Sequence, residues 1–237
     1  MRRTRLFFSP WFRSHRYIWV PLAGGVLALA GLALLLYPAI GGALTQHVED
    51  TLMHSLSTGS VVYIDPIAQP GEFFGEEDPG ADLADPDYQD PEAPPSTDPA
   101  LDGKIPLKCM GILSIPGIGL KAPILNGVSR RNLSYGLAHM KSTAGIGEKG
   151  SCCIFGHRCH TFGKFFNRLD DVGVGDTVTI LDAQGVTHTY TVKKKEVLLP
   201  TDRRLLNGGL SGRVLSLITC TPPGVASHRL VIRAVED

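Results

Sequence analysis

The sequence feature that most constrains the fold is an uncharged apolar stretch from Tyr17 to Leu44. A helix needs about 20 apolar residues to cross a bilayer, whereas the apolar core of a signal peptide usually has only about 7 to 15. Five arginines and no acidic residue precede this stretch. We therefore expect residues 17–44 to form an uncleaved transmembrane helix, with the basic residues 1–16 in the cytoplasm and the rest of the chain outside.

Charge is distributed unevenly along the remaining chain, although the formal net charge is zero. Residues 65–103 carry twelve acidic side chains, eight prolines and no lysine or arginine. Residues 104–237 carry 18 basic and 9 acidic side chains. This distribution excludes one soluble globular domain over the whole chain. It leaves about 130 residues for a compact outer domain, which is enough for a single core.

The segment between the predicted membrane helix and the outer domain, residues 45–104, has two parts. Residues 46–63 predict a short helix followed by an extended piece. Residues 65–103 predict a mostly disordered linker, because charge of one sign and frequent proline leave too little apolar surface to offset the ordering entropy. Two roles fit this linker: a stalk that holds the outer domain away from the membrane, or a lid whose Phe73, Phe74 or Tyr88 covers a cleft.

The outer domain, residues 105–237, has the pattern of an all-β fold. Short apolar runs separated by Gly, Pro or Asp predict strands at residues 111–115, 120–125, 177–181, 187–192, 196–199, 214–219 and 228–235. Two stretches, residues 130–136 and 163–169, favour short helices. Many short strands at close spacing indicate an antiparallel sandwich or barrel rather than a parallel α/β sheet.

Three reactive residue types lie at predicted strand ends in this domain. His157 follows the apolar residues Ile154 and Phe155, Cys220 ends a strand just before Pro222, and Arg229 begins the last strand. An unperturbed thiol is only a few per cent thiolate at neutral pH, so a nearby imidazole and guanidinium would matter to a nucleophilic cysteine. Taken singly, each residue also fits a structural role: a buried thiol, a core imidazole or a surface charge.

The motifs Gly156-His157-Arg158, LITCTP at residues 217–222 and SHRLVIR at residues 227–233 together resemble those of a sortase, a cysteine transpeptidase of Gram-positive cell surfaces. The resemblance covers residues 110–235, includes YGLAH at residues 135–139, and is strongest to the class C, pilin-polymerising members. It implies an eight-stranded β-barrel with short helices, preceded here by the membrane helix and the acidic linker. It also implies that Cys220, His157 and Arg229 are the catalytic residues.

The resemblance implies a membrane-anchored enzyme on the extracellular face of a Gram-positive bacterium. Cys220 would cleave an LPXTG-like sorting signal between Thr and Gly and form a thioester with the threonine. His157 would transfer protons, and Arg229 would hold the substrate or its oxyanion. The acyl acceptor would be a pilin lysine, in pilus assembly, or a peptidoglycan amine, as in a housekeeping sortase. We expect no cofactor, no metal and no nucleic-acid partner.

Several alternatives stay open at this level. A membrane-tethered barrel that captures acidic cell-wall polymers without catalysis is the competing function. His160 and His228 are rival imidazoles, and His139 is expected to order a loop. No spacing around Cys152, Cys153, Cys159 and His160 matches a zinc site, and the disulfide state of Cys109, Cys152, Cys153 and Cys159 is undetermined. The charged residues expected to be solvated are Arg158, Arg233 and Lys193 to Lys195.

Overall fold

The computed structural model describes residues 24–29, 31, 32, 47–64, 104–158 and 165–237 of the chain. The chain divides into two compact units, Met1–Thr45 and Gln46–Asp237. The described part of the first unit is helical, at residues 24–29 and 31–32. No helix among the described residues is long and apolar enough to cross a bilayer, and most of the predicted membrane helix lies outside them.

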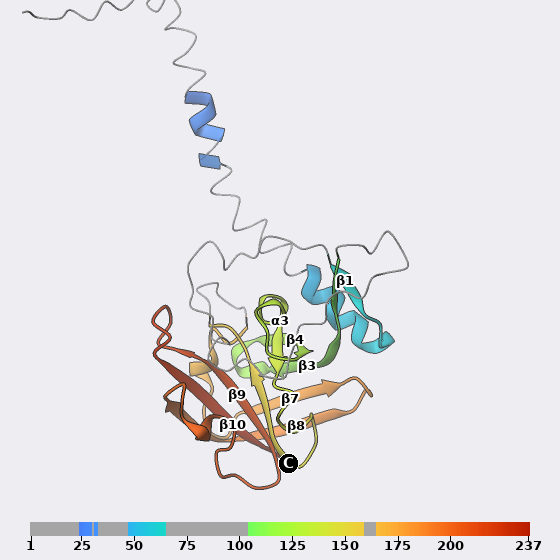
Figure 1. Ribbon diagram of the computed structural model, residues 1–237, viewed down its shortest axis with the longest axis vertical. Helices are drawn as coiled ribbons and strands as arrows, with labels where there is room; N and C mark the ends of the chain where they lie inside the picture. The colour runs from blue at the N-terminus through green and yellow to red at the C-terminus, as the bar shows by residue number, and fades with distance from the viewer. Residues whose placement is uncertain (1–23, 30, 33–46, 65–103, 159–164) are drawn as a thin grey trace, which may run out of the picture. The chain divides into compact units, whose positions relative to one another are not determined.

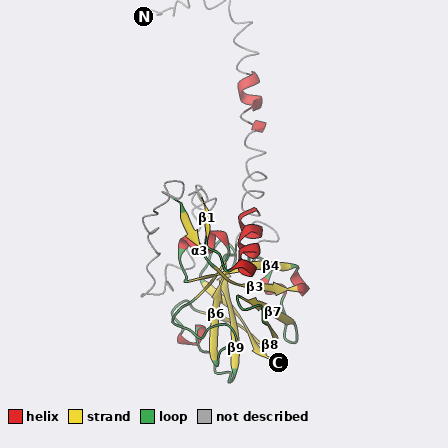
Figure 2. Ribbon diagram, turned by 90° about the vertical axis from the view of Figure 1, so that its right-hand side faces the viewer, coloured by secondary structure: helices red, strands yellow, loops and turns green. Residues whose placement is uncertain are grey.

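The second unit contains a closed barrel of eight strands (Figures 1 and 2). The strands, in the order in which they neighbour one another, are β10 (His228–Glu236), β8 (Thr187–Leu198), β7 (Thr177–Asp182), β3 (Cys109–Ile115), β4 (Leu120–Asn126), β5 (Leu137–His139), β6 (Gly150–Phe155) and β9 (Arg213–Thr221). Closure removes the exposed sheet edges on which other chains could pair. The prediction of an all-β, eight-stranded barrel is confirmed.

The barrel is mixed rather than wholly antiparallel, which corrects the sequence-based expectation. β4 runs parallel to β5, and β6 runs parallel to β9. Parallel neighbours cannot be joined by a tight hairpin and need a crossover. Between β4 and β5 the crossover carries the helix α3 (Arg130–Tyr135), whose N-cap residue Ser129 accepts a hydrogen bond from the Asn132 amide at 3.1 Å.

Two further expectations about local structure were wrong. The strands expected at residues 187–192 and 196–199 form one long strand, β8, which ends at Leu198 and whose pairing with β10 shifts register between Arg233 and Ala234. The bulge lets one strand continue where the apolar alternation in the sequence is interrupted. The helix expected at residues 163–169 is absent from its described part, which forms turns that lead into the 3-10 helix η3 (Leu169–Asp171).

Two apolar clusters lie on opposite faces of the barrel wall. The first receives side chains from all eight strands and therefore fills the barrel interior. The second lies outside the wall, where β6, β9 and β10 are covered by α3 and by the 3-10 helix η4 (Arg203–Leu205). Cys152 belongs to the first cluster and Cys153 to the second, as strand alternation requires.

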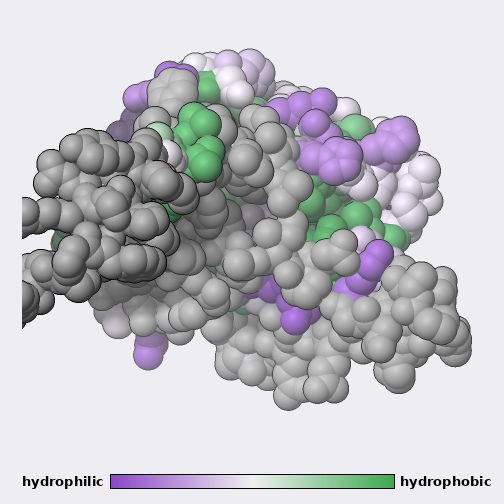
Figure 3. Space-filling view, turned by 90° about the horizontal axis from the view of Figure 1, so that it is seen from above, coloured by the Kyte–Doolittle hydropathy of each residue, from purple (hydrophilic) through white to green (hydrophobic). Residues whose placement is uncertain are grey.

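On the described surface seen from above, hydrophobic residues form patches bordered by hydrophilic ones (Figure 3).

Residues 47–64 pack onto the barrel, as a helix over residues 47–58 followed by the strand β1 (Val62–Ile64). This confirms the helix and extended piece expected over residues 46–63. Leu52 of the helix is fully buried, in a cluster that also holds Leu125 of β4. The compact unit therefore begins well before residue 105, the boundary that the sequence predicts.

The acidic segment, residues 65–103, lies outside the described residues, but the positions of its two ends are defined. β1 pairs antiparallel with β2 (Ile105–Leu107), and Ile64 is the Cα partner of Ile105. The segment thus leaves and re-enters the same two-stranded ribbon. This pairing contradicts the stalk interpretation, because a stalk must separate the two parts that it joins.

Candidate active site at the ends of three neighbouring strands

The cysteine and the arginine singled out in the sequence lie directly opposite each other. Cys220 on β9 and Arg229 on β10 are Cα partners in the antiparallel ladder. Side chains of directly opposed residues project from the same face of a sheet. Both are buried, with 7% of Cys220 and 3% of Arg229 exposed. The thiol and the guanidinium therefore share one sheltered face of the wall.

His157 lies on the opposite side of β9 from Arg229, just after the end of β6. β6 and β9 pair in parallel from Gly150 with Arg213 to Phe155 with Ile218, a constant offset of 63 positions. The Gly156 amide continues this pairing by donating to the Ile218 carbonyl at 3.1 Å. Extending the same offset by two residues beyond Phe155 and Ile218 puts His157 level with Cys220. Three neighbouring strand ends thus bring the predicted residues together in the order His157, Cys220, Arg229.

Two side-chain hydrogen bonds fix this alignment just beyond the end of β6. Thr219 Oγ1 donates to the Gly156 carbonyl at 2.7 Å, one position before the His157–Cys220 pair. Arg158 Nη1 donates to Thr221 Oγ1 at 3.1 Å, one position after that pair. The residues that flank His157 are therefore bonded to the residues that flank Cys220.

The glycine of the Gly156-His157-Arg158 motif has a packing reason. A Cβ atom at Gly156 would lie 2.6 Å from Cδ2 of Phe166 and 2.7 Å from Cδ2 of Leu137, closer than non-bonded carbons approach. The Phe166 amide also donates to the His157 carbonyl at 3.1 Å. A glycine lets the returning chain pack against this turn, and the returning chain holds the histidine backbone.

The predicted site faces the outer cluster and not the barrel interior. Phe155, Ile218 and Val231, which lie one row below it on the same three strands, all belong to the outer cluster. A small hollow opens at this level, lined by Leu133, Phe155, Gly156, Ile218, Thr219 and Arg229. The hollow leaves no interior space for even a water molecule, so its lining residues pack closely at this level.

Arg229 also holds the loop between β9 and β10. Its Nη1 donates to the Ala226 carbonyl at 2.8 Å and to the His228 carbonyl at 3.2 Å. Ala226 has a left-handed backbone, with φ of 54°, so the loop turns sharply just before the strand. The guanidinium is therefore oriented by its own loop, on the face that carries Cys220.

The rival histidines lie elsewhere. His228 precedes Arg229 on β10, and strand alternation directs it to the opposite face from Cys220. His139 is buried, and its Nε2 lies 2.9 Å from the Ala144 carbonyl, which confirms the expected loop-ordering role. His160 is outside the described residues. Among the described histidines, only His157 extends the row of Cys220.

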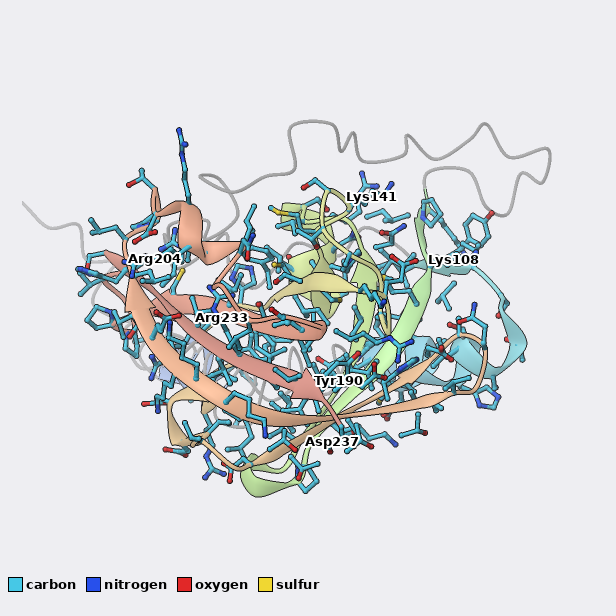
Figure 4. The ribbon with its side chains drawn as sticks, turned by 90° about the horizontal axis from the view of Figure 1, so that it is seen from below. Lys108, Lys141, Tyr190, Arg204, Arg233 and Asp237 are labelled. Atoms are coloured by element: carbon cyan, nitrogen blue, oxygen red, sulfur yellow. The ribbon has the colours of Figure 1, made fainter. Side chains whose placement is uncertain are left out.

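Two arginines that were expected to be solvated are buried, and that expectation was wrong. The Arg158 side chain is 6% exposed, and its Nη2 forms an ion pair with Asp170 Oδ2 at 2.7 Å. Arg233 is fully buried on β10, where it donates to Ser216 Oγ at 2.8 Å and to the Arg204 carbonyl (Figure 4). Sequence reasoning missed both, because alternation along a strand does not reveal which face a loop will cover.

The other described cysteines are free thiols. Cys109, Cys152 and Cys153 are all buried, and Cys159 lies outside the described residues. Burial in apolar surroundings raises the pKa of all three thiols above the ordinary value, because it disfavours the thiolate. A neutral buried thiol is a poor nucleophile. These three cysteines therefore serve packing.

A β-barrel with a cysteine, a histidine and an arginine aligned at the ends of three neighbouring strands indicates an enzyme with a cysteine nucleophile. A family model described as the sortase domain matches residues 113–237. That match covers more than half of the chain, and the protein belongs to the sortase family.

Curated and solved relatives agree with this assignment. The chain is 28% identical over 134 residues to sortase A of Streptococcus agalactiae, covering 54% of this chain and 53% of that protein. It thus spans about half the length of this curated relative. Sortase C-1 of Actinomyces oris is similar in structure, with 30% identity, a TM-score of 0.51, and coverage of 54% of this chain and 73% of that one. A pilus-related sortase C of group B Streptococcus matches at 32% identity, with a TM-score of 0.50 over 54% of this chain and 67% of that chain.

Proposed function

We propose that this protein is a cysteine transpeptidase that cleaves an LPXTG-like sorting signal between Thr and Gly and transfers the acyl part to an amine. The observation that carries the proposal is the row of His157, Cys220 and Arg229 at three neighbouring strand ends of a sortase-family barrel. A non-catalytic binding module would not require a cysteine, a histidine and an arginine in one row.

The first half of the reaction forms a thioester. In the reactive state Cys220 is a thiolate and its proton resides on His157; the sulfur Sγ attacks the threonine carbonyl carbon, and the peptide bond to glycine breaks. His157, as an imidazolium, donates a proton to the departing glycine amine. Arg229 stabilises the negative charge that develops on the carbonyl oxygen, because a guanidinium presents fixed donors to it. Splitting the transfer at a thioester replaces one difficult step with two easier ones.

The second half returns the enzyme to its starting state. An amine attacks the thioester carbon, neutral His157 accepts its proton, and the bond to Cys220 Sγ breaks. For the acceptor we propose a pilin lysine, which is supported by the similarity to a pilus-related sortase C. A peptidoglycan amine is the second candidate acceptor.

For the location we propose the outer face of the cell membrane. The support is in the sequence: five arginines lie before the uncharged stretch at residues 17–44, and acidic and polar residues follow it. Positive charge retained on the cytoplasmic side would place residues 46–237 outside. Surface or pilin proteins that carry sorting signals would be met there.

The test is mass spectrometry of the full-length protein in detergent with an LPXTG-type peptide. We expect an acyl adduct on Cys220 that hydroxylamine releases, and no adduct on the Cys220→Ala variant. A lysine peptide and a peptidoglycan-type oligoglycine amine, offered together, then identify the acceptor from the mass of the product. An intact peptide and an unmodified Cys220 after long incubation would exclude the transpeptidase proposal and favour the binding module.

A further inference from the structure

Arg158 is an almost fully buried cation that the proposed reaction does not use. Its side chain is 6% exposed, and its guanidinium lies between two oxygen partners. Nη1 donates to Thr221 Oγ1 at 3.1 Å, and Nη2 pairs with Asp170 Oδ2 at 2.7 Å. A planar guanidinium can hold two partners in fixed directions, which the single point charge of a lysine cannot do.

The bond between Arg158 and Thr221 lies next to the proposed catalytic residues. Arg158 directly follows His157, and Thr221 directly follows Cys220. β6 ends at Phe155, so the regular pairing with β9 stops before the level of His157. Beyond that end, the bond from Arg158 to Thr221 joins the two segments one position after His157 and Cys220. A side-chain contact thus continues the alignment that backbone hydrogen bonds provide inside the barrel.

Asp170 contributes less than Thr221 to this arrangement. Its side chain is 50% exposed, and it belongs to η3 and to neither β6 nor β9. Ion pairs with a half-exposed partner contribute little net stability because solvent screens them. The pair therefore orients the guanidinium, and the hydroxyl of Thr221 receives the bond that aligns the strand ends.

We propose that Arg158 is a positioning residue that holds His157 beside Cys220 by bonding to Thr221. This inference rests on the proposed transpeptidase function. In this role Arg158 acts on the reaction indirectly, because its bond to Thr221 joins the residue after His157 to the residue after Cys220. A misplacement of about 1 Å between reacting groups can cost about 100-fold in rate, so a contact this close to the pair affects turnover more than binding.

The experiment compares kinetics of four full-length variants in detergent: Arg158→Met, Arg158→Lys, Thr221→Val and the double variant Arg158→Met with Thr221→Val. We expect Arg158→Met to lower kcat for peptide cleavage by about 10- to 100-fold, with KM changed by less than about threefold. Arg158→Lys should retain an intermediate kcat. The double variant should be no slower than Arg158→Met alone, because both changes remove the same bond.

A matched control and a second readout separate positioning from stability. Arg168 also forms an ion pair with an aspartate of η3, Asp171, at 2.8 Å, but its side chain is 37% exposed. Arg168→Met should therefore leave kcat within about twofold of the parent. In addition, the pH profile of Cys220 alkylation by iodoacetamide should change in Arg158→Met and not in Arg168→Met, because only the former separates the thiol from the imidazole.

Three results would overturn the inference: a kcat near the parent value in Arg158→Met, additive losses in the double variant, or an unchanged alkylation profile. Each is distinguishable from failure of the proposed function. If the parent protein forms no acyl adduct on Cys220 at all, the transpeptidase proposal fails. If the parent forms the adduct and Arg158→Met turns over equally fast, only the positioning role fails.

Discussion

Cys220 and Arg229 are direct cross-strand partners, joined by the ladder between β9 and β10. They are nine positions apart in sequence, and only residues 222–227 lie between the two strands, so the thiol and the guanidinium are brought together by local structure. His157, by contrast, lies 63 positions before Cys220 and depends on the parallel pairing of β6 with β9. The predicted catalytic row therefore combines one local and one long-range contact.

Replacing Cys220 with alanine should abolish peptide cleavage and leave the fold intact. Cys220 is the last residue but one of β9, on the outer face of the wall, and the change removes a single sulfur atom. We expect the free energy of unfolding to change by about 1 kcal/mol or less. Peptide turnover and circular dichroism melting check the two parts separately. Cys152→Ala, which removes a thiol from the barrel interior, should instead lower stability and retain turnover per folded molecule.

Arg229→Lys should lower kcat/KM by about 100-fold although the charge is retained, because an ammonium cannot bond to the loop carbonyls and stabilise an oxyanion at once. Steady-state kinetics with a sorting peptide measure the effect. Arg203→Lys, an exposed change in η4, is the control and should be kinetically silent. Turnover of Arg229→Lys close to that of the parent would assign Arg229 to holding the loop alone.

His188 predicts a pH-dependent contribution to stability at the opposite ends of the strands. Its Nδ1 lies 2.7 Å from Glu236 Oε1, and its Nε2 lies 3.1 Å from Asp182 Oδ2. Burial by itself would lower the pKa of His188, but the hydrogen bonds and charges of Glu236 and Asp182 outweigh it and raise this pKa above the ordinary value. Burial would likewise raise the pKa of Asp182, yet bonds from the Val186 amide and from His188 lower it.

The directions of these two pKa shifts determine how stability depends on pH. A raised histidine pKa contributes stability that is fully present below the ordinary value of about 6.5 and is lost as pH rises through the folded-state pKa. The lowered Asp182 pKa contributes stability above about 4 that is lost at lower pH. The destabilisation by His188→Gln, measured by urea unfolding, should thus be largest near pH 5 to 6 and shrink above neutral pH. His54→Gln, at an exposed position, should show no such dependence; a pH-independent effect of His188→Gln would contradict the assignment.

A protease cut within residues 65–103 should leave the two fragments associated. Three pairs of residues join β1 to β2, and the helix over residues 47–58 buries Leu52 against the barrel. A two-stranded ribbon alone is marginal in water, so the helix supplies most of the attachment. Size-exclusion chromatography of the nicked full-length protein in detergent should show one peak that contains both fragments.

Leu52→Ala is the matched variant for this experiment. It should weaken the attachment by about 2 to 5 kcal/mol and release the fragment that begins after the cut. His47→Ala changes an exposed residue of the same helix and should not release it. Separation of the parent fragments under native conditions would mean that residues 47–64 are not integral to the barrel domain.

Much of the fold was predictable because it depends on local pattern. Short alternating runs and turn residues predicted most strands of the barrel, and the helix with its following extended piece was predicted over residues 46–63. The motifs around His157, Cys220 and Arg229 predicted the family, which the match over residues 113–237 shows. The catalytic roles of these three residues remain predictions for the variants above to test.

The sequence by itself determined the strand content, the reactive residues and the unequal distribution of charge, because these are properties of neighbouring residues. Only the tertiary structure decided which distant segments meet. It paired Ile64 with Ile105 across the acidic segment, and it set β6 parallel to β9. It also buried Arg158 and Arg233 under loops. Strand alternation assigns a residue to one of two faces, but whether that face meets water depends on packing between segments far apart in the chain.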